Sequence, residues 1–373
     1  MHPHPLPRFI LGCLAAGLLA VHAADPEEVP SLAGLEWEKD AKPFFKSVEP
    51  VWKEPGYMMC TDIIRFQGQL YCTFREGSGH VPGKTGVNGR IRVLRADDPA
   101  GHGWKTVALL DETGVDLRDP KLSITPDGRL MIIMGGSFYR GEERLGMHGR
   151  VSFSDTNGAN FSAPQPIVIP ESIATKDDWL WRVTWHEGTA WGSLYQVPQK
   201  RQYRLHLVKS RDGITWENVA KLEVPDPSET TLRFDAAGTM FAWIRTSGKP
   251  QDGRTGTARA PYTQWEFKRI GETFGGPNFV ALPGGGWLAG ARLDQREPFN
   301  HTAIGTLDFA RGTFTRLFAL PSRGDNGDNG YPGFVVDEDR GEVLVSYYSA
   351  HERKLPAIYL ARLDLAALRE VVK

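Results

Sequence analysis

The chain has 373 residues, and its 44 Lys and Arg are balanced by 45 Asp and Glu. A formal net charge of −1 gives no bulk field that would attract nucleic acid or an anionic membrane. Hydrophobic residues at 40% and charged residues at 24% exclude a disordered chain, and three Cys are too few for a disulfide framework. The length is compatible with one large all-β domain or with two smaller domains.

The first residues have the pattern of a secretory signal. Arg8 precedes an apolar run from Phe9 to Val21, which is shorter than the roughly 20 residues needed to cross a bilayer. Val21-His22-Ala23 then provides a small-residue cleavage site. We therefore expect a signal peptide over residues 1–23, export to the periplasm or the medium, and no membrane span. Residues 24–50 are expected to form an N-terminal extension, and residues 51–373 the folded domain.

A hairpin pattern recurs six times along the chain. Each copy has a β-rich run, a turn that contains glycine and a second β-rich run. The copies cover residues 63–71, 122–130, 183–191, 232–240, 279–287 and 334–343. Their turn glycines are at positions 68, 128, 188, 238, 286 and 341, so consecutive ones are 48 to 60 residues apart. Glycine suits these turns because positive φ costs it little.

A third short β-rich run follows each hairpin. These runs cover residues 91–95, 150–153, 205–209, 256–259, 303–307 and 357–362. Meanders of strands that repeat about every 50 residues are typical of β-propellers. We predict an all-β, six-bladed β-propeller with four-stranded antiparallel blades; a β-sandwich with fortuitous periodicity is the alternative. A short helix is predicted at the C-terminus, over residues 363–372.

Polar residues occupy matching positions in the repeats, where a propeller would bring them to one axial pocket. Those before the hairpins are Arg118, Asp119, Arg182, Glu229, Asn278 and Tyr331, and those after them are Arg75, Glu76, Arg245, Arg292, Tyr348 and His351. Any single arginine can instead form a salt bridge between blades. Together they predict a cationic, Tyr-rich pocket for a ligand with a carboxylate, which guanidinium groups hold bidentately.

One turn carries a family resemblance. Ser210-Arg211-Asp212-Gly213-Ile214-Thr215-Trp216 resembles the Asp-box of the sialidase superfamily, shortened by one residue, and residues 154–161 are a weaker copy. The Asp carboxylate accepts N–H bonds of its own turn while the aromatic side chain packs between blades. The chain thus resembles bacterial sialidase-like, BNR-repeat proteins over almost all of its mature sequence.

This resemblance implies roles for several residues. In retaining sialidases a Tyr is the nucleophile, a Glu polarises it, three Arg hold the substrate carboxylate and an Asp is the acid/base. Glu229 and Arg245 are spaced like the family's Glu and second Arg, and Gly327 to Phe334 resembles the segment with the nucleophile, which would be Tyr331. Arg292 or Arg296 would be the third Arg.

Two positions depart from the family pattern. The place of the first Arg reads Met59-Cys60-Thr61-Asp62, and the loop of residues 74–83 holds Glu76 and His80 where the acid/base Asp is expected. Histidine can act as a general acid near neutral pH. The candidates to replace the missing arginine are Arg75, Arg118 or Arg182. These departures favour an acidic sugar other than sialic acid, such as a uronic acid.

The hypothesis is a secreted, exo-acting glycoside hydrolase of carbohydrate metabolism that removes a terminal acidic sugar from a glycan. A uronic-acid-directed lyase or inverting hydrolase on the same propeller is one alternative. A non-catalytic carbohydrate-binding propeller is another, favoured by the missing arginine. No cofactor or metal is expected: residues 325–330 resemble a calcium loop, but the closing bidentate carboxylate is missing, so they are interpreted as an Asn-Gly turn.

Overall fold

The computed structural model describes residues 41–373, apart from residues 84–85, 200–201, 249–251, 294–299 and 325–326. The predicted signal peptide and Arg296 lie outside the described residues. Within the described part, no helix is both long enough and apolar enough to cross a membrane.

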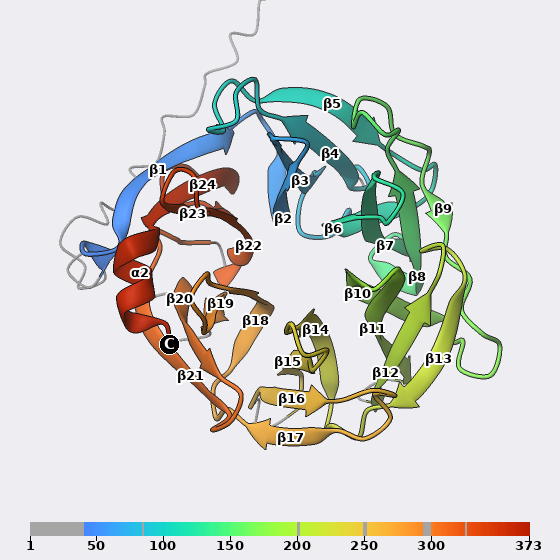
Figure 1. Cartoon of the computed structure of the whole chain (residues 1–373). Coiled ribbons are helices and arrows are strands. Elements are labelled where there is room, and N and C mark those ends of the chain that lie inside the picture. Colours follow the sequence, from blue (N-terminus) through green and yellow to red (C-terminus); the bar gives the residue numbers. More distant parts are fainter. Residues whose placement is uncertain (1–40, 84–85, 200–201, 249–251, 294–299, 325–326) are drawn as a thin grey trace, which may run out of the picture.

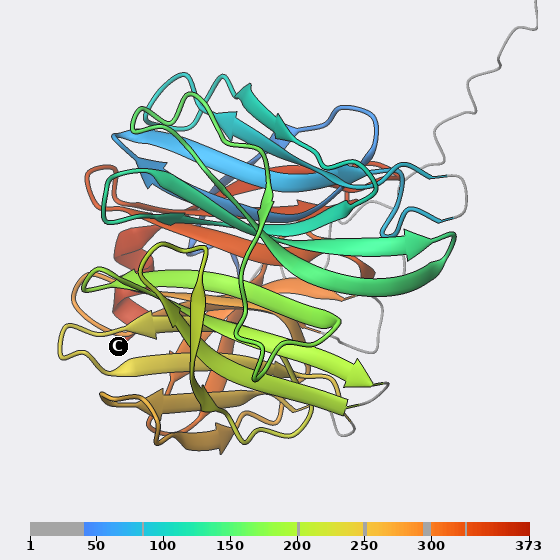
Figure 2. The same ribbon diagram turned by 90° about the vertical axis from the view of Figure 1, so that its right-hand side faces the viewer.

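Antiparallel sheets surround a central axis (Figure 1), and viewed from the side their strands run from one end of the ring to the other (Figure 2). Four sheets have four strands each. They are β2 (Tyr57–Phe66), β3 (Gln69–Gly77), β4 (Arg90–Arg95) and β5 (Lys105–Leu110); β14 (Pro227–Phe234), β15 (Met240–Thr246), β16 (Arg254–Ala258) and β17 (Glu266–Arg269); β18 (Phe274–Ala281), β19 (Trp287–Leu293), β20 (His301–Asp308) and β21 (Thr313–Ala319); and β22 (Gly330–Asp337), β23 (Glu342–Ser349) and β24 (Ala357–Asp364) with β1 (Phe45–Trp52).

The remaining strands form one eight-stranded sheet made of two antiparallel groups. The groups are β6 (Asp116–Ile124), β7 (Leu130–Arg140), β8 (Glu143–Phe153) and β9 (Gln165–Pro166), followed by β10 (Asp177–His186), β11 (Thr189–Gln199), β12 (Gln202–Ser210) and β13 (Trp216–Lys221). Strand β8 pairs in parallel with β10 through two residue pairs, Met147 with Asp177 and His148 with Asp178.

The prediction of an all-β propeller with four-stranded antiparallel sheets is confirmed. The described residues contain four separate four-stranded sheets rather than six, because two of the predicted blades are joined. Strand β8 has 11 residues, whereas the corresponding strand β4 has 6. Its additional length carries it to β10, where the two groups share hydrogen bonds.

The two ends of the described chain meet in one sheet. Strand β1 pairs with β24, with Val48 opposite Ala361 (Figure 1). Residues 45–50, which were expected to lie in the extension, are therefore part of the last sheet. Helix α2 (Leu365–Val371) follows β24 and confirms the predicted C-terminal helix; the carboxylate of Asp364 caps it by accepting a 2.8 Å hydrogen bond from the Ala367 N–H.

The predicted turns are also confirmed. All six hairpin glycines have positive φ, between 63° and 80°. In the turn that resembles an Asp-box, Asp212 Oδ1 accepts hydrogen bonds from the backbone N–H groups of Ile214 and Thr215, both at 2.8 Å. Trp216 beside it is 2% exposed and packs into an apolar cluster together with Met131 and Val208.

The innermost strands share an irregularity that the repeat pattern did not predict. In β2, β6, β10, β14, β18 and β22, the pairing with the next strand breaks near the start and leaves two residues unpaired. Such bulges change the direction of side chains. The break has a left-handed residue in four of these strands, namely Cys60, Asp119, Gly276 and Tyr331. These breaks lie at the end of the ring opposite the hairpin turns.

Candidate active site

Three of the predicted residues meet at the breaks in β14 and β22. The Tyr331 hydroxyl donates a hydrogen bond of 2.7 Å to Glu229 Oε1. Arg245, near the end of β15, places Nη1 2.7 Å from the same oxygen and 3.3 Å from the Tyr331 hydroxyl. Tyr331 is 8% exposed and Glu229 is 6% exposed. A phenol, a carboxylate and a guanidinium from separate strands are thus held together in a nearly buried group.

Gly276 shapes this group from β18. Its backbone N–H donates a hydrogen bond of 2.6 Å to Glu229 Oε2, the oxygen that Tyr331 leaves free. Its φ is +61°, and a Cβ at this position would overlap the Tyr331 ring. Glycine is required here by both the backbone conformation and the close approach of the ring.

The surroundings of Tyr331 keep its phenol protonated at rest. Burial raises its pKa well above the ordinary value, and the negative charge of Glu229 raises the pKa further, while Arg292 and Arg245 act in the opposite direction. The Arg292 guanidinium carbon lies 5.3 Å from the centre of the Tyr331 ring, and Lys121 Nζ lies 6.0 Å from it. The Arg292 and Arg245 guanidinium groups would stabilise charge that develops on the ring oxygen.

A second cluster is centred on Asp328. Its carboxylate accepts hydrogen bonds from the hydroxyls of Tyr348, at 2.6 Å, and Tyr57, and it lies 3.5 Å from Arg292 Nη1. His80 Nδ1 lies 2.9 Å from Asp328 Oδ2. Burial opposes the charged form, but the contacts with His80, Tyr348 and Tyr57 outweigh it and hold the pKa of Asp328 below its ordinary value.

His80 is the exposed member of the second cluster, with 55% of its side chain accessible. Because the Asp328 carboxylate can only accept, its contact assigns a proton to Nδ1 of His80. The other ring nitrogen, Nε2, lies 3.3 Å from Arg118 Nη2. An imidazole that a carboxylate orients in this way can transfer protons through its second nitrogen.

Only one of the three substitutes for the missing arginine reaches these clusters. Arg75 is completely buried against Asp116, with 2.6 Å between Nη2 and Oδ1, and its Nη1 donates to the Gly79 carbonyl at 2.8 Å. It thereby supports the loop that carries His80. Arg182 is buried and paired with Asp62 at 2.8 Å.

Arg118 is the arginine that reaches His80. It also lies 3.4 Å from Asp116 Oδ2 and donates to the Tyr139 hydroxyl at 3.3 Å. Within the part of the chain that the structure describes, Arg118, Arg245 and Arg292 thus contact Tyr331 or the residues that hydrogen-bond around it.

Two further candidates have structural contacts instead. Glu76 is held by Arg90 at 2.8 Å and by Arg92 at 2.6 Å, within its own sheet. The Asn278 amide donates to the Pro332 carbonyl and accepts from Arg233, both at 2.9 Å, so it fixes the strand that follows Tyr331. The structure does not bring either side chain into the two clusters.

His351 and Asp119 also differ from the expectation. His351 lies against Tyr347 and Tyr359, and burial lowers its pKa from the ordinary value to about 4. Asp119 is buried at the break in β6, and its negative charge adds to burial in raising the pKa of the Cys60 thiol. His351 belongs to the packing of the last sheet, and neither side chain has a hydrogen bond to Tyr331 or Asp328.

The prediction that the site is strongly cationic is wrong, because each of its arginines has a carboxylate partner. Arg245 pairs with Glu229, Arg292 with Asp328 and Arg118 with Asp116. Nearly buried guanidinium groups require such partners, because an unpaired charge is costly away from water. The site is therefore a network of alternating charges, in which the arginines keep only part of their hydrogen-bonding capacity for a ligand.

The sequence patterns missed three contributors: Asp328, Tyr57 and Gly276. Asp328 lies three residues before Tyr331, within the segment from Gly327 to Phe334 that the sequence analysis identified. Its closeness to the predicted nucleophile could therefore have indicated a role in the site. Tyr57 reaches Asp328 from the opposite end of the sequence and has no local signature. Among the described residues, no group of three or more His, Cys, Asp or Glu has the arrangement of a metal site.

Comparisons with known proteins find the fold but no family. No protein-family model matches the chain, and no curated protein matches it. A solved structure of a protein of unknown function from Dyadobacter fermentans has a TM-score of 0.70 at 19% identity, covering 85% of this chain and 99% of the other.

Two further solved structures are of glycan-directed proteins. Trypanosoma rangeli sialidase has a TM-score of 0.65 at 14% identity; the match covers 87% of this chain and only 59% of the sialidase. Penicillium chrysogenum α-L-arabinanase, complexed with arabinobiose, has a TM-score of 0.62 at 14% identity, covering 88% and 99% of the two chains. At such low identities, these matches establish a sialidase-like propeller fold for this chain and nothing more specific.

Proposed function

We propose that this protein is a glycoside hydrolase that removes a terminal acidic sugar from glycans, with Tyr331 as nucleophile. The observation that carries the proposal is the 2.7 Å hydrogen bond from the Tyr331 hydroxyl to Glu229, with Arg245 beside both. The sialidase and arabinanase folds support the general class of reaction. We also infer that the eight-stranded sheet acts as two blades, which gives the propeller six.

In this proposal the Tyr331 hydroxyl approaches the anomeric carbon uncharged and passes its proton to Glu229 as its oxygen attacks. In the same step the bond from that carbon to the leaving-group oxygen breaks, and His80 donates a proton to this oxygen. Water then attacks the same carbon, His80 takes up a proton from the water, and Tyr331 leaves and regains its proton from Glu229. A neutral phenol suits a substrate whose anomeric carbon bears a carboxylate, because an anionic nucleophile would be repelled.

The remaining groups hold the substrate. Arg245 and Arg292 flank Tyr331, and Arg118 approaches from the side of His80. In this proposal the three guanidinium groups bind the sugar carboxylate, and Arg118 replaces the arginine that is missing near Cys60. Asp328 orients His80 as the acid/base, which replaces the aspartate expected from the family resemblance.

Covalent trapping tests the proposal directly. A fluorinated acidic glycosyl fluoride that forms a slowly hydrolysed intermediate should add one sugar to the peptide containing Tyr331, detected by mass spectrometry. Tyr331→Phe should lower kcat/KM for aryl glycosides of acidic sugars by at least a thousandfold and abolish labelling. Tyr347→Phe is the matched control, since that hydroxyl donates to the Pro321 carbonyl outside the site. Full activity in Tyr331→Phe would exclude the nucleophile.

We further infer that residues 1–23 direct export and are removed. N-terminal sequencing of the protein recovered from outside the cytoplasm should give a chain that starts near Ala24. An uncleaved chain that stays in the cytoplasm would contradict this inference.

A further inference from the structure

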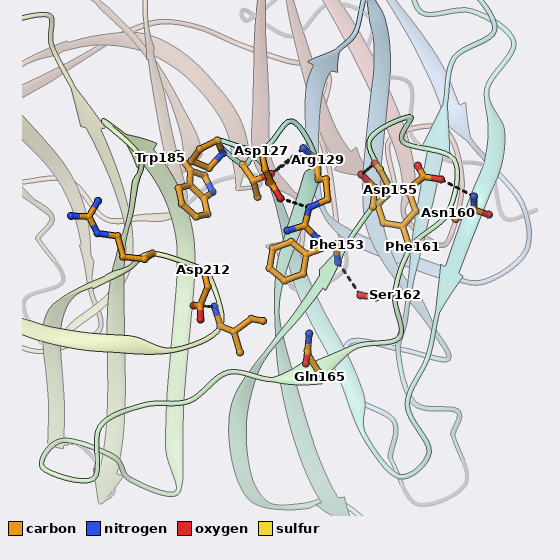
Figure 3. A pocket seen from close by; sticks show the side chains of 16 residues that line it. Asp127, Arg129, Phe153, Asp155, Asn160, Phe161, Ser162, Gln165, Trp185 and Asp212 are labelled. Carbon is orange, nitrogen blue, oxygen red and sulfur yellow. Dashed lines mark hydrogen bonds and ion pairs between the residues drawn. The ribbon is translucent and has the colours of Figure 1, made fainter.

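A cavity lies at the hairpin-turn end of the ring, away from Tyr331. Its volume is about 780 Å³, and it is formed between the group β6–β9 and the group β10–β13. Arg118 belongs to the candidate active site at the start of β6, whereas Thr125, seven residues later, lines this cavity. At about 3.3 Å per residue, the two sites are on the order of 20 Å apart. We refer to this space as the turn-end cavity (Figure 3).

The walls of the turn-end cavity are fixed by backbone hydrogen bonds. The segment after β9 joins both groups: the Val168 N–H donates to the Ile214 carbonyl at 2.8 Å, and the Trp216 N–H donates to the Val168 carbonyl at 2.9 Å. A volume of this size lies in the range of sites for small molecules, which are largely preformed. The cavity therefore needs no rearrangement of its backbone to accept a ligand.

Aromatic faces supply the apolar part of the lining. Trp185, Phe153 and Phe161 all border the cavity (Figure 3). The Arg129 guanidinium covers one of these rings, lying 4.8 Å from the centre of Phe153. Aromatic faces bordered by planar polar groups match the surface of a sugar ring, which has apolar C–H faces and a rim of hydroxyl groups.

The carboxylates of the cavity are already engaged. Asp127 accepts from Arg129 Nε at 2.8 Å, and Asp155 accepts from Asn160 Nδ2 at 2.7 Å. Asp212 accepts two backbone N–H groups of its own turn. The lining holds three carboxylates, of Asp127, Asp155 and Asp212, and two guanidinium groups, of Arg129 and Arg211, so the charges nearly cancel and the cavity offers no strong field that would select a cation or an anion.

Two polar side chains of the cavity remain available. Among the described residues, neither the amide of Gln165 nor the guanidinium of Arg211 has a hydrogen-bond or ion-pair partner, and both residues are exposed. A cavity of about 710 Å³ between the next two sheets also has an exposed amide and guanidinium, those of Gln264 and Arg259, but its Trp265 already stacks on Phe267, with ring centroids 5.7 Å apart. Its Trp265 donates to the Tyr262 carbonyl at 2.9 Å, and its Lys268 donates to the Ala310 carbonyl at 2.6 Å.

We infer that the turn-end cavity is a binding site for an uncharged oligosaccharide, with Trp185 as the stacking surface and Gln165 and Arg211 as hydrogen-bonding groups. It is separate from the proposed catalytic site and does not depend on the proposed reaction. If the substrate is a long glycan, the turn-end cavity would hold its neutral sugars while its acidic terminal sugar is cleaved at Tyr331.

Binding measurements on the full chain test this inference. The probes are neutral trisaccharides built from glucose, xylose, mannose, galactose or arabinose, followed by calorimetry and by hydrogen exchange. At least one probe should bind saturably and protect residues 125–129 and 211–215 from exchange. Trp185→Ala should weaken that binding at least tenfold, and Gln165→Ala and Arg211→Ala should each weaken it severalfold.

Gln264→Ala, in the cavity between the next two sheets, is the matched control and should leave the affinity unchanged. Hydrolysis of a small aryl glycoside reports on Tyr331 alone and should be the same in Trp185→Ala as in the unmodified chain. Saturable binding that none of the three variants alters would overturn the inference, as would the absence of binding by every probe. Dimerisation that Trp185→Ala abolishes would show instead that the cavity receives a second copy of the chain. If Trp185→Ala does not fold, the two exposed variants decide.

Discussion

Glu229 has three donors around its two carboxylate oxygens: the Tyr331 hydroxyl, the Arg245 guanidinium and the Gly276 N–H. Of these donors, only the phenol can lose its proton under ordinary conditions, because guanidinium and amide groups do not. The arrangement therefore directs proton transfer along one hydrogen bond. It also holds Glu229 in a fixed position, which is a requirement for a base that acts on a buried hydroxyl.

Gly276→Ala tests how strictly Tyr331 is positioned. The new Cβ would overlap the ring of Tyr331, and the left-handed backbone would be strained in addition. We expect a loss of about 1–3 kcal/mol in the free energy of unfolding, together with a loss of at least a hundredfold in kcat. Thermal unfolding and steady-state kinetics measure the two effects.

Gly128→Ala separates strain from displacement. Gly128 has a φ of +76°, but a Cβ there would meet no atom within 4 Å. It should lose stability of about 1 kcal/mol through strain while kcat stays unchanged. Equal activity in the two variants would show that the contact between Gly276 and Tyr331 does not position the phenol.

His351 predicts a dependence of stability on pH. Burial lowers its pKa to about 4 in the folded chain, whereas the unfolded chain takes up the proton near pH 6.5. Its contribution is therefore intact above pH 6.5 and is lost as the pH falls towards 4, by at most about 3 kcal/mol. His351→Gln should flatten this part of the curve of unfolding free energy against pH. An unchanged slope between pH 6.5 and 4 would contradict the prediction.

At the scale of elements, the hairpins could be predicted from the sequence because their determinants are local. Glycine at a turn between two β-rich runs is enough to locate each pair of strands, and all six turn glycines have the expected sign of φ. The joining of β8 and β10 could not be predicted in this way. The joining depends on how far β8 extends towards β10. Strand β8 begins at Glu143 and β10 begins at Asp177, 34 residues later, so the contact is not local in the sequence.

The breaks in the inner strands had an unused signal in the sequence. Three of the left-handed residues directly precede proline, as in Asp119-Pro120, Gly276-Pro277 and Tyr331-Pro332. Proline cannot donate to a neighbouring strand, so within a sheet it is typical of edges and bulges. If these prolines had been interpreted as marks of bulges, the sequence would have predicted that the neighbouring side chains do not alternate regularly between the two faces of the sheet. Tyr331 reaches Glu229 because it lies at such a bulge.

At the scale of the whole molecule, charge was the least predictable property of the site. The positions of Arg118, Arg245 and Arg292 in the repeat were sufficient to predict that they approach the axis. Asp116 lies two residues before Arg118, and Glu229 lies in the strand that pairs with the strand of Arg245, so these two partners were near in the sequence or in the predicted hairpin. Asp328 comes from the segment before the next sheet and has no repeat position that would pair it with Arg292. The number of arginines alone therefore overestimated the positive charge available to a ligand.

Closure of the ring is the property that depends on both ends of the described chain. Strand β1 pairs with β24, and Glu49 Oε1 accepts from Arg362 Nη2 at 2.7 Å; the side chain of Arg362 is 9% exposed. A chain that begins at residue 54 loses this strand, exposes one edge of β24 and leaves Arg362 with Glu342 as its remaining carboxylate partner. We expect a large fall in Tm and faster unfolding in denaturant, because an unpaired edge and a weakened buried ion pair are both destabilising. A chain that begins at residue 41 keeps β1 and is the control, with an unchanged Tm. Equal stability of the two chains would mean that β24 forms an adequate outer strand by itself, and that the first strand does not close the ring.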